Sequence, residues 1–291
     1  MRDPKIEREI RAAWPRRPRR AHKTDFGRVF ILAGSRGLIG AASLASLAAL
    51  RAGAGLVTLG CPDKVYFILA RRYPEVMVKP FASTPSGALS EKGFREISRF
   101  LKTQDILAMG PGLGRDPSTV RLIRKIALHS FVPLIMDADA INAFQGGPGL
   151  LKKCAHPPIL TPHPGEFVRV FGGRRPEQES ERKRRALAVA RAFNVILLLK
   201  GCRTVVANPR GKAFVNPTGN PGMATGGTGD VLTGIIAALL GQGIFPFEAA
   251  CFAGYLHGLA GDLAAREKGE VSLMASDLIE FFPRALKLVL K

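Results

Sequence analysis

Short runs of apolar and β-branched residues alternate along the chain with longer stretches whose apolar positions recur at the spacing of an α-helix. The short runs predict strands at 29–33, 56–60, 105–109, 133–137, 158–161, 195–200, 204–207 and 213–216. The longer stretches predict helices at 41–52, 181–193, 230–240, 246–267 and 276–290. Such alternation is typical of an α/β fold in which helices cover both faces of a mainly parallel central sheet.

The chain has the size and composition of one globular domain. Its 291 residues are 46% hydrophobic, which is enough to build a large core. The sequence contains neither an internal repeat nor a long low-complexity linker. We therefore expect a basic leader over residues 1–22, followed by a single domain over residues 23–291.

Loops rich in glycine and proline follow several predicted strands. They lie at 34–37, 110–114, 161–166 and 216–230. In a parallel sheet the carboxyl ends of the strands share one edge, and ligands bind at that edge. Four such loops therefore predict a binding cleft.

The last of these loops ends in the glycine turn Gly226-Gly227-Thr228-Gly229, followed by Asp230 and an apolar helix. Glycines let the backbone approach a ligand closely, and the start of a helix offers free N–H groups and the positive end of its dipole. This pattern predicts an anion hole for a transferring phosphate, with Asp230 placed to accept the proton of an attacking hydroxyl. The alternative is that Asp230 only caps the helix. The long polar loop before it and the apolar helix after it favour the catalytic interpretation.

Better-known motifs are missing from the sequence. It contains no GxxxxGK[ST], no GxGxxG after the first predicted strand and no GxSxG, which argues against P-loop proteins, Rossmann dehydrogenases and α/β-hydrolases. The four cysteines are far apart and form no CxxC pair or zinc spacing, so we expect reduced thiols and no metal site built from protein ligands.

The formal net charge of +20 indicates a surface that attracts anions. One basic cluster, at 16–23, precedes the first predicted strand, and another, at 182–185, lies on a predicted helix. A solvated helix face is the simpler interpretation of the second cluster. Neither cluster is interleaved with the aromatic residues of a single-strand binding surface, so nucleic acid is a disfavoured partner.

The ends and apolar stretches of the chain bear on its location. The first residues are charged where a signal peptide needs an apolar core. The apolar stretches at 38–50 and 231–240 are too short to span a bilayer. We therefore expect a soluble, cytoplasmic protein without a membrane partner.

Two further motifs narrow the choice of family: GPGLG at 110–114 and TPHPGE at 161–166. Together with the glycine turn and Asp230, they resemble the ADP- or ATP-dependent NAD(P)H-hydrate dehydratases, repair enzymes of the ribokinase-like superfamily. The glycine turn is shared with sugar and vitamin kinases, whereas the other two motifs are more specific. The resembling stretches run in the family's order at 22–27, 51–57, 110–114, 137–142, 160–166, 199–201 and 216–230.

The resemblance implies a ribokinase-like fold and a hydro-lyase reaction. The enzyme would transfer a phosphate from ADP, or from ATP, to the hydroxyl on C6 of the (S)-hydrate of NADH or NADPH. Loss of that phosphate, driven by the lone pair of the ring nitrogen, would restore the reduced cofactor. Mg²⁺ is expected on the nucleotide phosphates, held mostly by phosphate and water oxygens.

The same resemblance assigns roles to individual residues. Asp230 would bind the substrate and activate its hydroxyl, and the amides of Gly227, Thr228 and Gly229 would form the anion hole. The hydrated dinucleotide would be contacted by Ala41, Gly114 and His163. The adenine nucleotide would be contacted by Lys200, Gly201, Cys202, Arg203, Thr204 and Gly229. Cys202 and Arg203 are bulkier than the family's usual pair, and Arg203 could touch the nucleotide phosphates or point to solvent.

Several candidates have a structural alternative. His163 lies between two prolines, where it could only pack a turn. Asp137, Asp139 and Asn142 follow a predicted strand and could either cap the next helix or face the cleft. Lys23 could belong to the leader or reach a phosphate.

The alternative function is a small-molecule kinase of the same superfamily, acting on a hydroxymethyl-pyrimidine, a thiazole alcohol or a sugar. The motifs at 110–114 and 161–166 argue against it. Many relatives carry a fused N-terminal epimerase domain, for which this chain has no room, so the resemblance implies a separate epimerase or spontaneous epimerisation. It also implies a homo-oligomer, often a tetramer.

Overall fold

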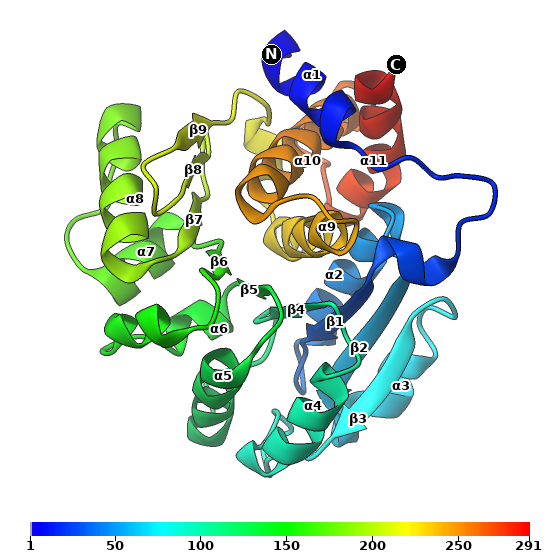
Figure 1. The fold of residues 1–291 in the computed structure, drawn as a ribbon, viewed down its shortest axis with the longest axis vertical. Helices are drawn as coiled ribbons and strands as arrows, with labels where there is room; N and C mark the ends of the chain where they lie inside the picture. The colour runs from blue at the N-terminus through cyan, green and yellow to red at the C-terminus, as the bar shows by residue number, and fades with distance from the viewer. Residues whose placement is uncertain (1) are drawn as a thin grey trace.

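A nine-stranded sheet forms the centre of the computed structural model, which describes residues 2–291 (Figure 1). Its strand order is β3-β2-β1-β4-β5-β6-β7-β8-β9; the neighbours from β3 to β7 are parallel, and β8 and β9 pair in the antiparallel sense. The strands are β1 Arg28–Leu32, β2 Leu56–Pro62, β3 Met77–Phe81, β4 Ile106–Met109, β5 Leu134–Met136, β6 Ile159–Leu160, β7 Ile196–Leu199, β8 Val205–Ala207 and β9 Ala213–Val215.

Helices cover both faces of the sheet (Figure 1). One layer contains α2 Ile39–Arg51, α9 Thr228–Gly241, α10 Pro246–Lys268 and α11 Ala275–Leu290. The other layer contains α4 Phe94–Leu101, α5 Pro117–His129, α6 Asp139–Asn142, α7 Pro164–Phe171 and α8 Glu179–Phe193. Alternate residues of β1 enter the two cores, because Val29 and Ile31 pack with the first layer and Phe30 and Leu32 with the second. The predicted α/β architecture is confirmed.

The predicted strands all appear, but β3 was missed. Pro80 lies within it and most of its residues are partly or fully exposed, so it lacks the apolar run that marks the other strands. A strand at the edge of the sheet tolerates both features because only one of its sides pairs with a neighbour. Helix α3, Tyr66–Ala70, connects β2 to this edge.

The N-terminal residues include a helix that the sequence analysis did not predict. Helix α1, Pro4–Ala13, lies beside α11 (Figure 1). Its Ile6 and Ile10 are buried, and the Glu7 carboxylate accepts hydrogen bonds from the Tyr255 hydroxyl (2.6 Å) and the Arg2 guanidinium (2.6 Å). The division into a leader over 1–22 and a domain over 23–291 stays a prediction.

The motifs at 22–27 and 51–57 meet at the amino-terminal edge of the sheet, away from the loops that follow the strands. The Gly55 amide donates to Phe26 O, and a Cβ on Gly55 would lie 1.7 Å from the carbonyl oxygen of Lys23. Lys23 therefore lies at the edge opposite to the glycine turn, and of its two alternatives the structure favours the leader over phosphate contact.

Candidate functional site

The glycine turn leads into α9 with its amides free. Gly227 is the N-cap and has a φ of 95°, which favours glycine, and a Cβ there would lie 2.5 Å from Leu44 Cδ1. The first intrahelical bond runs from Val231 N to Gly227 O (3.1 Å). Among residues 2–291 the N–H groups of Gly227, Thr228, Gly229 and Asp230 have no acceptor, so four donors and the positive helix end are available to an anion.

Two side chains hold this turn in place. The Thr228 hydroxyl donates to the carbonyls of Met223 and Thr225, each at 3.1 Å. Nε2 of His257, from the middle of α10, lies 2.9 Å from Thr228 O. Burial lowers the pKa of His257 to about 4, so the imidazole is neutral at pH 7 and Nε2–H donates to that carbonyl.

A buried ion pair lies next to the turn. Asp137, at the end of β5, is 1% exposed, and its Oδ1 accepts hydrogen bonds from Lys200 Nζ (2.8 Å) and Thr161 Oγ1 (2.7 Å). Lys200 follows β7. A Cβ on Gly229 would lie 3.0 Å from Lys200 Nζ and 3.7 Å from Asp137 Oδ2. The ends of β5 and β7 and the start of α9 therefore meet at one place.

The chain turns sharply between the two aspartates that follow β5. Ala138 has a φ of 46°, which few residues other than glycine adopt and which is found mostly where function or packing requires it. Of the two alternatives for Asp137, the structure favours the cleft, because α6 has no side-chain cap. Asp139 Oδ2 accepts from Gly114 N (2.9 Å), and Asn142 Oδ1 accepts from Arg169 (2.6 Å).

Asp230 occupies the third residue of α9 and makes no capping hydrogen bond. Burial raises its pKa to about 7; the Asp137 and Glu166 carboxylates act in the same direction and Lys200 opposes them. Burial acts to lower the pKa of Lys200, but Asp137 and Glu166 outweigh it and raise that pKa. A carboxylate that titrates near neutral pH beside free amides has the properties of a general base.

His163 is the N-cap of α7. Its Nδ1 accepts from Gly165 N (3.0 Å), and its own N–H donates to Glu166 Oε2 (2.9 Å), which completes a capping box. About half of its side chain is exposed, and burial together with Lys200 lowers its pKa, so the ring is neutral at pH 7. Capping of α7 therefore explains the role of His163 Nδ1, and contact between His163 and the substrate stays a prediction.

Ala41, in the first turn of α2, lies next to the loop after β4 that contains Gly114. Gly112 is close to Ala41 of α2, since a Cβ on Gly112 would lie 3.2 Å from that of Ala41. The Ser35 hydroxyl donates to Gly112 O (2.8 Å), which ties the loop after β1 to the loop after β4. One turn further along α2, Leu44 contacts Gly227. The two predicted substrate contacts therefore belong to the same edge of the sheet as the glycine turn.

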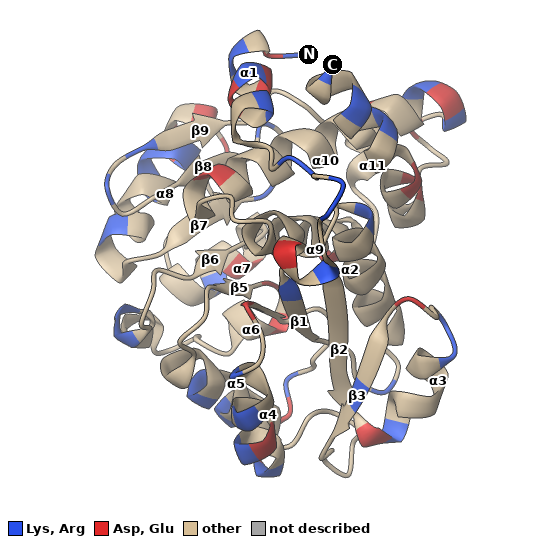
Figure 2. Ribbon diagram, turned by 45° about the vertical axis from the view of Figure 1, so that its right-hand side comes forward, with Lys and Arg blue, Asp and Glu red and all other residues tan. Residues whose placement is uncertain are grey.

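The loop from Lys200 to Thr204 joins β7 to β8. The Thr204 hydroxyl donates to Gly201 O (3.0 Å), and the Arg203 guanidinium pairs with Glu179 of α8. Arg182 of α8 packs against this loop; it is buried and donates to the carbonyls of Leu199, at the end of β7, and of Lys200 and Cys202 in the loop. The expectation that the cluster at 182–185 is a solvated face is wrong for Arg182. Other Lys and Arg residues are spread over α4, α5, α8 and the segment after α1 (Figure 2).

The site's carboxylates do not form a ready-made metal centre. Within residues 2–291 no three His, Cys, Asp or Glu side chains are grouped so that they could hold a metal ion. A cavity of about 740 Å³ lies at the amino-terminal edge of the sheet, lined by Leu134, Ile159, Ile196 and other residues, and it contains none of the predicted site residues. The residues described here contain no helix long and apolar enough to cross a membrane.

The site thus combines the free amides of α9, Asp230 and the Lys200–Asp137 pair. Comparison with known proteins identifies the family. The sequence profile described as NAD(P)H-hydrate dehydratase matches residues 29–284. The chain belongs to this family. The resemblance inferred from the motifs is thereby confirmed.

Individual relatives agree with this assignment. The chain is 48% identical over 285 residues to the bifunctional NAD(P)H-hydrate repair enzyme Nnr of Moorella thermoacetica, covering 96% of this chain and 54% of that protein. The ADP/ATP-dependent NAD(P)H-hydrate dehydratase of Bacillus subtilis, co-crystallised with ATP and Mg²⁺, has a TM-score of 0.83 and 34% identity, with 97% of each chain covered. A ribokinase-like superfamily protein of Enterococcus faecalis has a TM-score of 0.81 and 29% identity, covering 97% of this chain and 94% of that one.

The dehydratase fold is therefore ribokinase-like, as predicted. The chain spans about half the length of the curated relatives it matches. Four residues of the site were not predicted as site residues: Thr161, Glu166, Arg182 and His257. Asp137 was left between two alternatives. Asp137 and Glu166 lie within motifs that the sequence analysis quoted, whereas Arg182 and His257 carry no motif signal.

Proposed function

We propose that the protein dehydrates the (S)-hydrate of NADH or NADPH at the expense of a nucleotide phosphate. The observation that carries this proposal is the half-buried Asp230 carboxylate, with a pKa raised to about 7, at the free amide end of α9 in a chain of the dehydratase family. Asp230 would take the proton of the C6 hydroxyl as that hydroxyl oxygen attacks the terminal phosphorus of the nucleotide. The bond from this phosphorus to the bridging oxygen breaks, and its electron pair leaves with AMP when ADP is the donor, or with ADP when ATP is the donor. The amides of Gly227, Thr228 and Gly229 would hold the transferring phosphate, with Lys200 beside them.

The second half of the reaction is an elimination. The C6–O bond breaks, its electron pair leaves with the phosphate, and the lone pair of the ring nitrogen replaces it. Loss of a proton from the neighbouring ring carbon then restores the reduced nicotinamide. We assign ADP as the donor, with ATP as the alternative, and place the nucleotide on Lys200–Thr204 and Gly229.

Mg²⁺ fits this arrangement as a nucleotide-bound ion. The described residues offer no three-ligand metal group, so Mg²⁺ would be held mainly by phosphate and water oxygens, with Asp137 and Asp230 nearby. When bound, it would neutralise charge on the phosphates. Ala41, Gly114 and His163 would hold the hydrated dinucleotide. We further propose a cytoplasmic homo-oligomer, such as a tetramer, which size-exclusion chromatography with light scattering would test.

The deciding assay follows the return of reduced-nicotinamide absorbance from the hydrate, with ADP and ATP in parallel reactions. We expect recovery with at least one nucleotide, and we expect Asp230→Asn to lose it while still binding ADP. Retained turnover in Asp230→Asn would remove the proposed base. No recovery by the unmodified protein, together with phosphorylation of a thiazole or pyrimidine alcohol, would establish the kinase alternative instead.

A further inference from the structure

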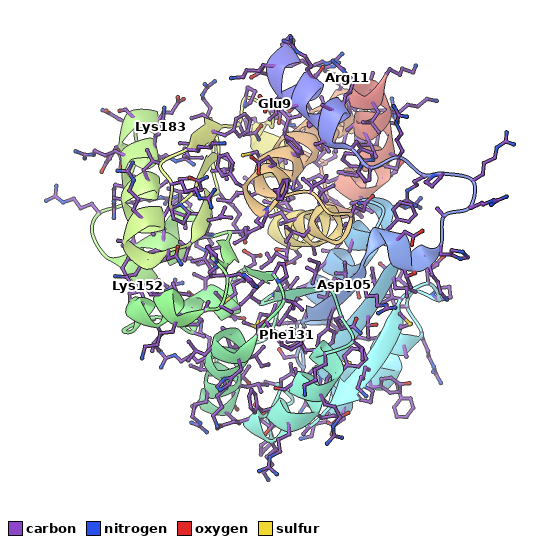
Figure 3. All side chains as sticks on the ribbon, in the orientation of Figure 1. Glu9, Arg11, Asp105, Phe131, Lys152 and Lys183 are labelled. Carbon is purple, nitrogen blue, oxygen red and sulfur yellow. The ribbon has the colours of Figure 1, made fainter. Side chains whose placement is uncertain are left out.

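The loop that joins β7 to β8 is held from behind by a buried arginine. Arg182 of α8 is 6% exposed, and its guanidinium donates to the carbonyls of Leu199 and Lys200, each at 3.1 Å, and to that of Cys202. Its Nε has no partner among the described residues. The next residue, Lys183, is exposed and lies on the outer side of α8 (Figure 3). A buried cation bound to backbone oxygens requires a reason, because burial of a charge is costly.

The carbonyls that face Arg182 determine where the loop's amides point. Every peptide bond of the described residues is trans, so each N–H is antiparallel to the carbonyl of the preceding residue. Because the carbonyls of Lys200 and Cys202 point at Arg182, the N–H groups of Gly201 and Arg203 point away from it. Neither N–H has an acceptor within residues 2–291, and both residues are exposed.

The backbone of the loop is shaped for this arrangement. Gly201 has a φ of 134°, which favours glycine, and a Cβ on it would crowd Arg182 Nη2 at 3.0 Å. Arg203 has a left-handed φ of 54°. Its guanidinium pairs with Glu179, also on α8. Successive amides in such turns form anion-binding concavities.

We propose that Arg182 is a positioning residue that fixes the peptide units of this loop, so that the Gly201 and Arg203 amides form a second anion site. Its ligand is a phosphate of the adenine nucleotide, and this identity rests on the proposed function. The site lies next to Lys200, whose ammonium is close to the glycine turn, so two backbone donor sets flank one lysine. The bulky Cys202-Arg203 pair is compatible with this role because backbone atoms, rather than side chains, contact the phosphate.

The test compares binding of ADP with binding of adenosine, which lacks phosphate, by calorimetry. Arg182→Met keeps an unbranched apolar stem but removes the guanidinium and its donors, and it is expected to weaken ADP binding about tenfold or more while changing adenosine binding less than about threefold. Arg182→Lys is expected to fall between. Arg184→Met, an exposed neighbour of the same charge, is the matched control and is expected to bind ADP like the unmodified protein. In turnover, the KM for ADP is expected to rise with little change in kcat.

Equal losses for ADP and adenosine, or no loss for either, would overturn the proposal. If Arg182→Met does not fold, Glu179→Gln removes the second contact from α8 and is expected to weaken ADP binding selectively; an unchanged ADP affinity in that variant counts against the site. ADP binding is measured without turnover, so the proposed function and the role of Arg182 can be overturned independently of each other. Arg182-dependent ADP binding without hydrate repair overturns only the proposed function, whereas repair with Arg182-independent ADP binding overturns only this inference.

Discussion

Lys200 Nζ lies 2.8 Å from Asp137 Oδ1, and this ion pair joins the ends of β7 and β5, two strands that are separated in the sheet by β6. The same nitrogen lies 3.0 Å from where a Cβ on Gly229 would be. The pair therefore links the sheet to the start of α9, and it places a positive charge beside the free amides of the glycine turn.

The two partners of the ion pair should not contribute independently to stability. We expect Lys200→Met and Asp137→Asn each to lower the free energy of unfolding by about 3 kcal/mol, because each leaves a partner without its counter-charge in a largely buried site. The double variant should lose less than the sum, with an interaction energy on the order of 1 kcal/mol or more. Urea unfolding of the four proteins gives this value. Strictly additive losses would mean that the pair contributes nothing as a unit.

Substitution of Gly229 should lower activity by crowding the site and should leave folding intact. Alanine is well tolerated in the first turn of a helix, so Gly229→Ala should fold normally. Its Cβ would displace Lys200 Nζ from the glycine turn, and we expect kcat/KM to fall on the order of 100-fold. Gly149→Ala, where a Cβ would meet no atom within 4 Å, is the matched control. Full activity in Gly229→Ala would show that the lysine need not lie there.

Much of this fold could be predicted because its signals are local. The apolar runs of β1, β4 and β7 and the periodicity of α9 and α10 identify them without any knowledge of their neighbours. Strand β3 lacks that signal, because Pro80 and its exposure are acceptable only at an edge, and being at an edge is a property of the whole sheet. Helix α1 differs, because its Asp3 cap and the spacing of Ile6 and Ile10 are local signals; only its packing against α11 is a property of the folded chain.

The residues of the site likewise differ in whether the local sequence reveals them. The glycine turn and Asp230 are one continuous segment, so their joint role could be inferred from spacing. Asp137 and Lys200 are 63 positions apart, and their contact depends on the order of strands β5, β6 and β7, which spacing does not specify. Arg182 was assigned to solvent because its run of basic neighbours is typical of an exposed face; only the packing of α8 against the loop shows otherwise.

The rate of hydrate repair should depend on the ionisation of Asp230. A general base must be unprotonated, so kcat/KM is expected to rise with pH up to about 7, where burial has raised the pKa of Asp230, and then to level off. Because Lys200 lowers this pKa and Asp137 raises it, the residual activity of Lys200→Met should titrate at higher pH and that of Asp137→Asn at lower pH. If kcat/KM rises at the same pH in both variants as in the unmodified protein, the titrating group is not Asp230.

The raised pKa of Asp230, which suits catalysis, should make the fold less stable as the pH rises. The ordinary pKa of this group is 3.8 and its folded value is about 7, so between these pH values the folded chain keeps a proton that the unfolded chain has released. The stability associated with Asp230 is therefore fully present below pH 4 and is lost as pH rises through 7. Asparagine cannot ionise, so Asp230→Asn should gain on the unmodified protein by about 1–3 kcal/mol between pH 4 and pH 8, after allowance for partial exposure.

Urea unfolding of both proteins at pH 4.5, 6 and 8 measures this difference. Glu75→Gln, which removes an exposed carboxylate without an ion pair among the described residues, controls for the loss of one negative charge. If the curves of Asp230→Asn and the unmodified protein stay parallel over this range, Asp230 is solvated rather than buried, and it could not be tuned to act near pH 7. A gain in stability at pH 8 combined with lost turnover would instead show that the fold keeps a costly carboxylate in place for its chemistry.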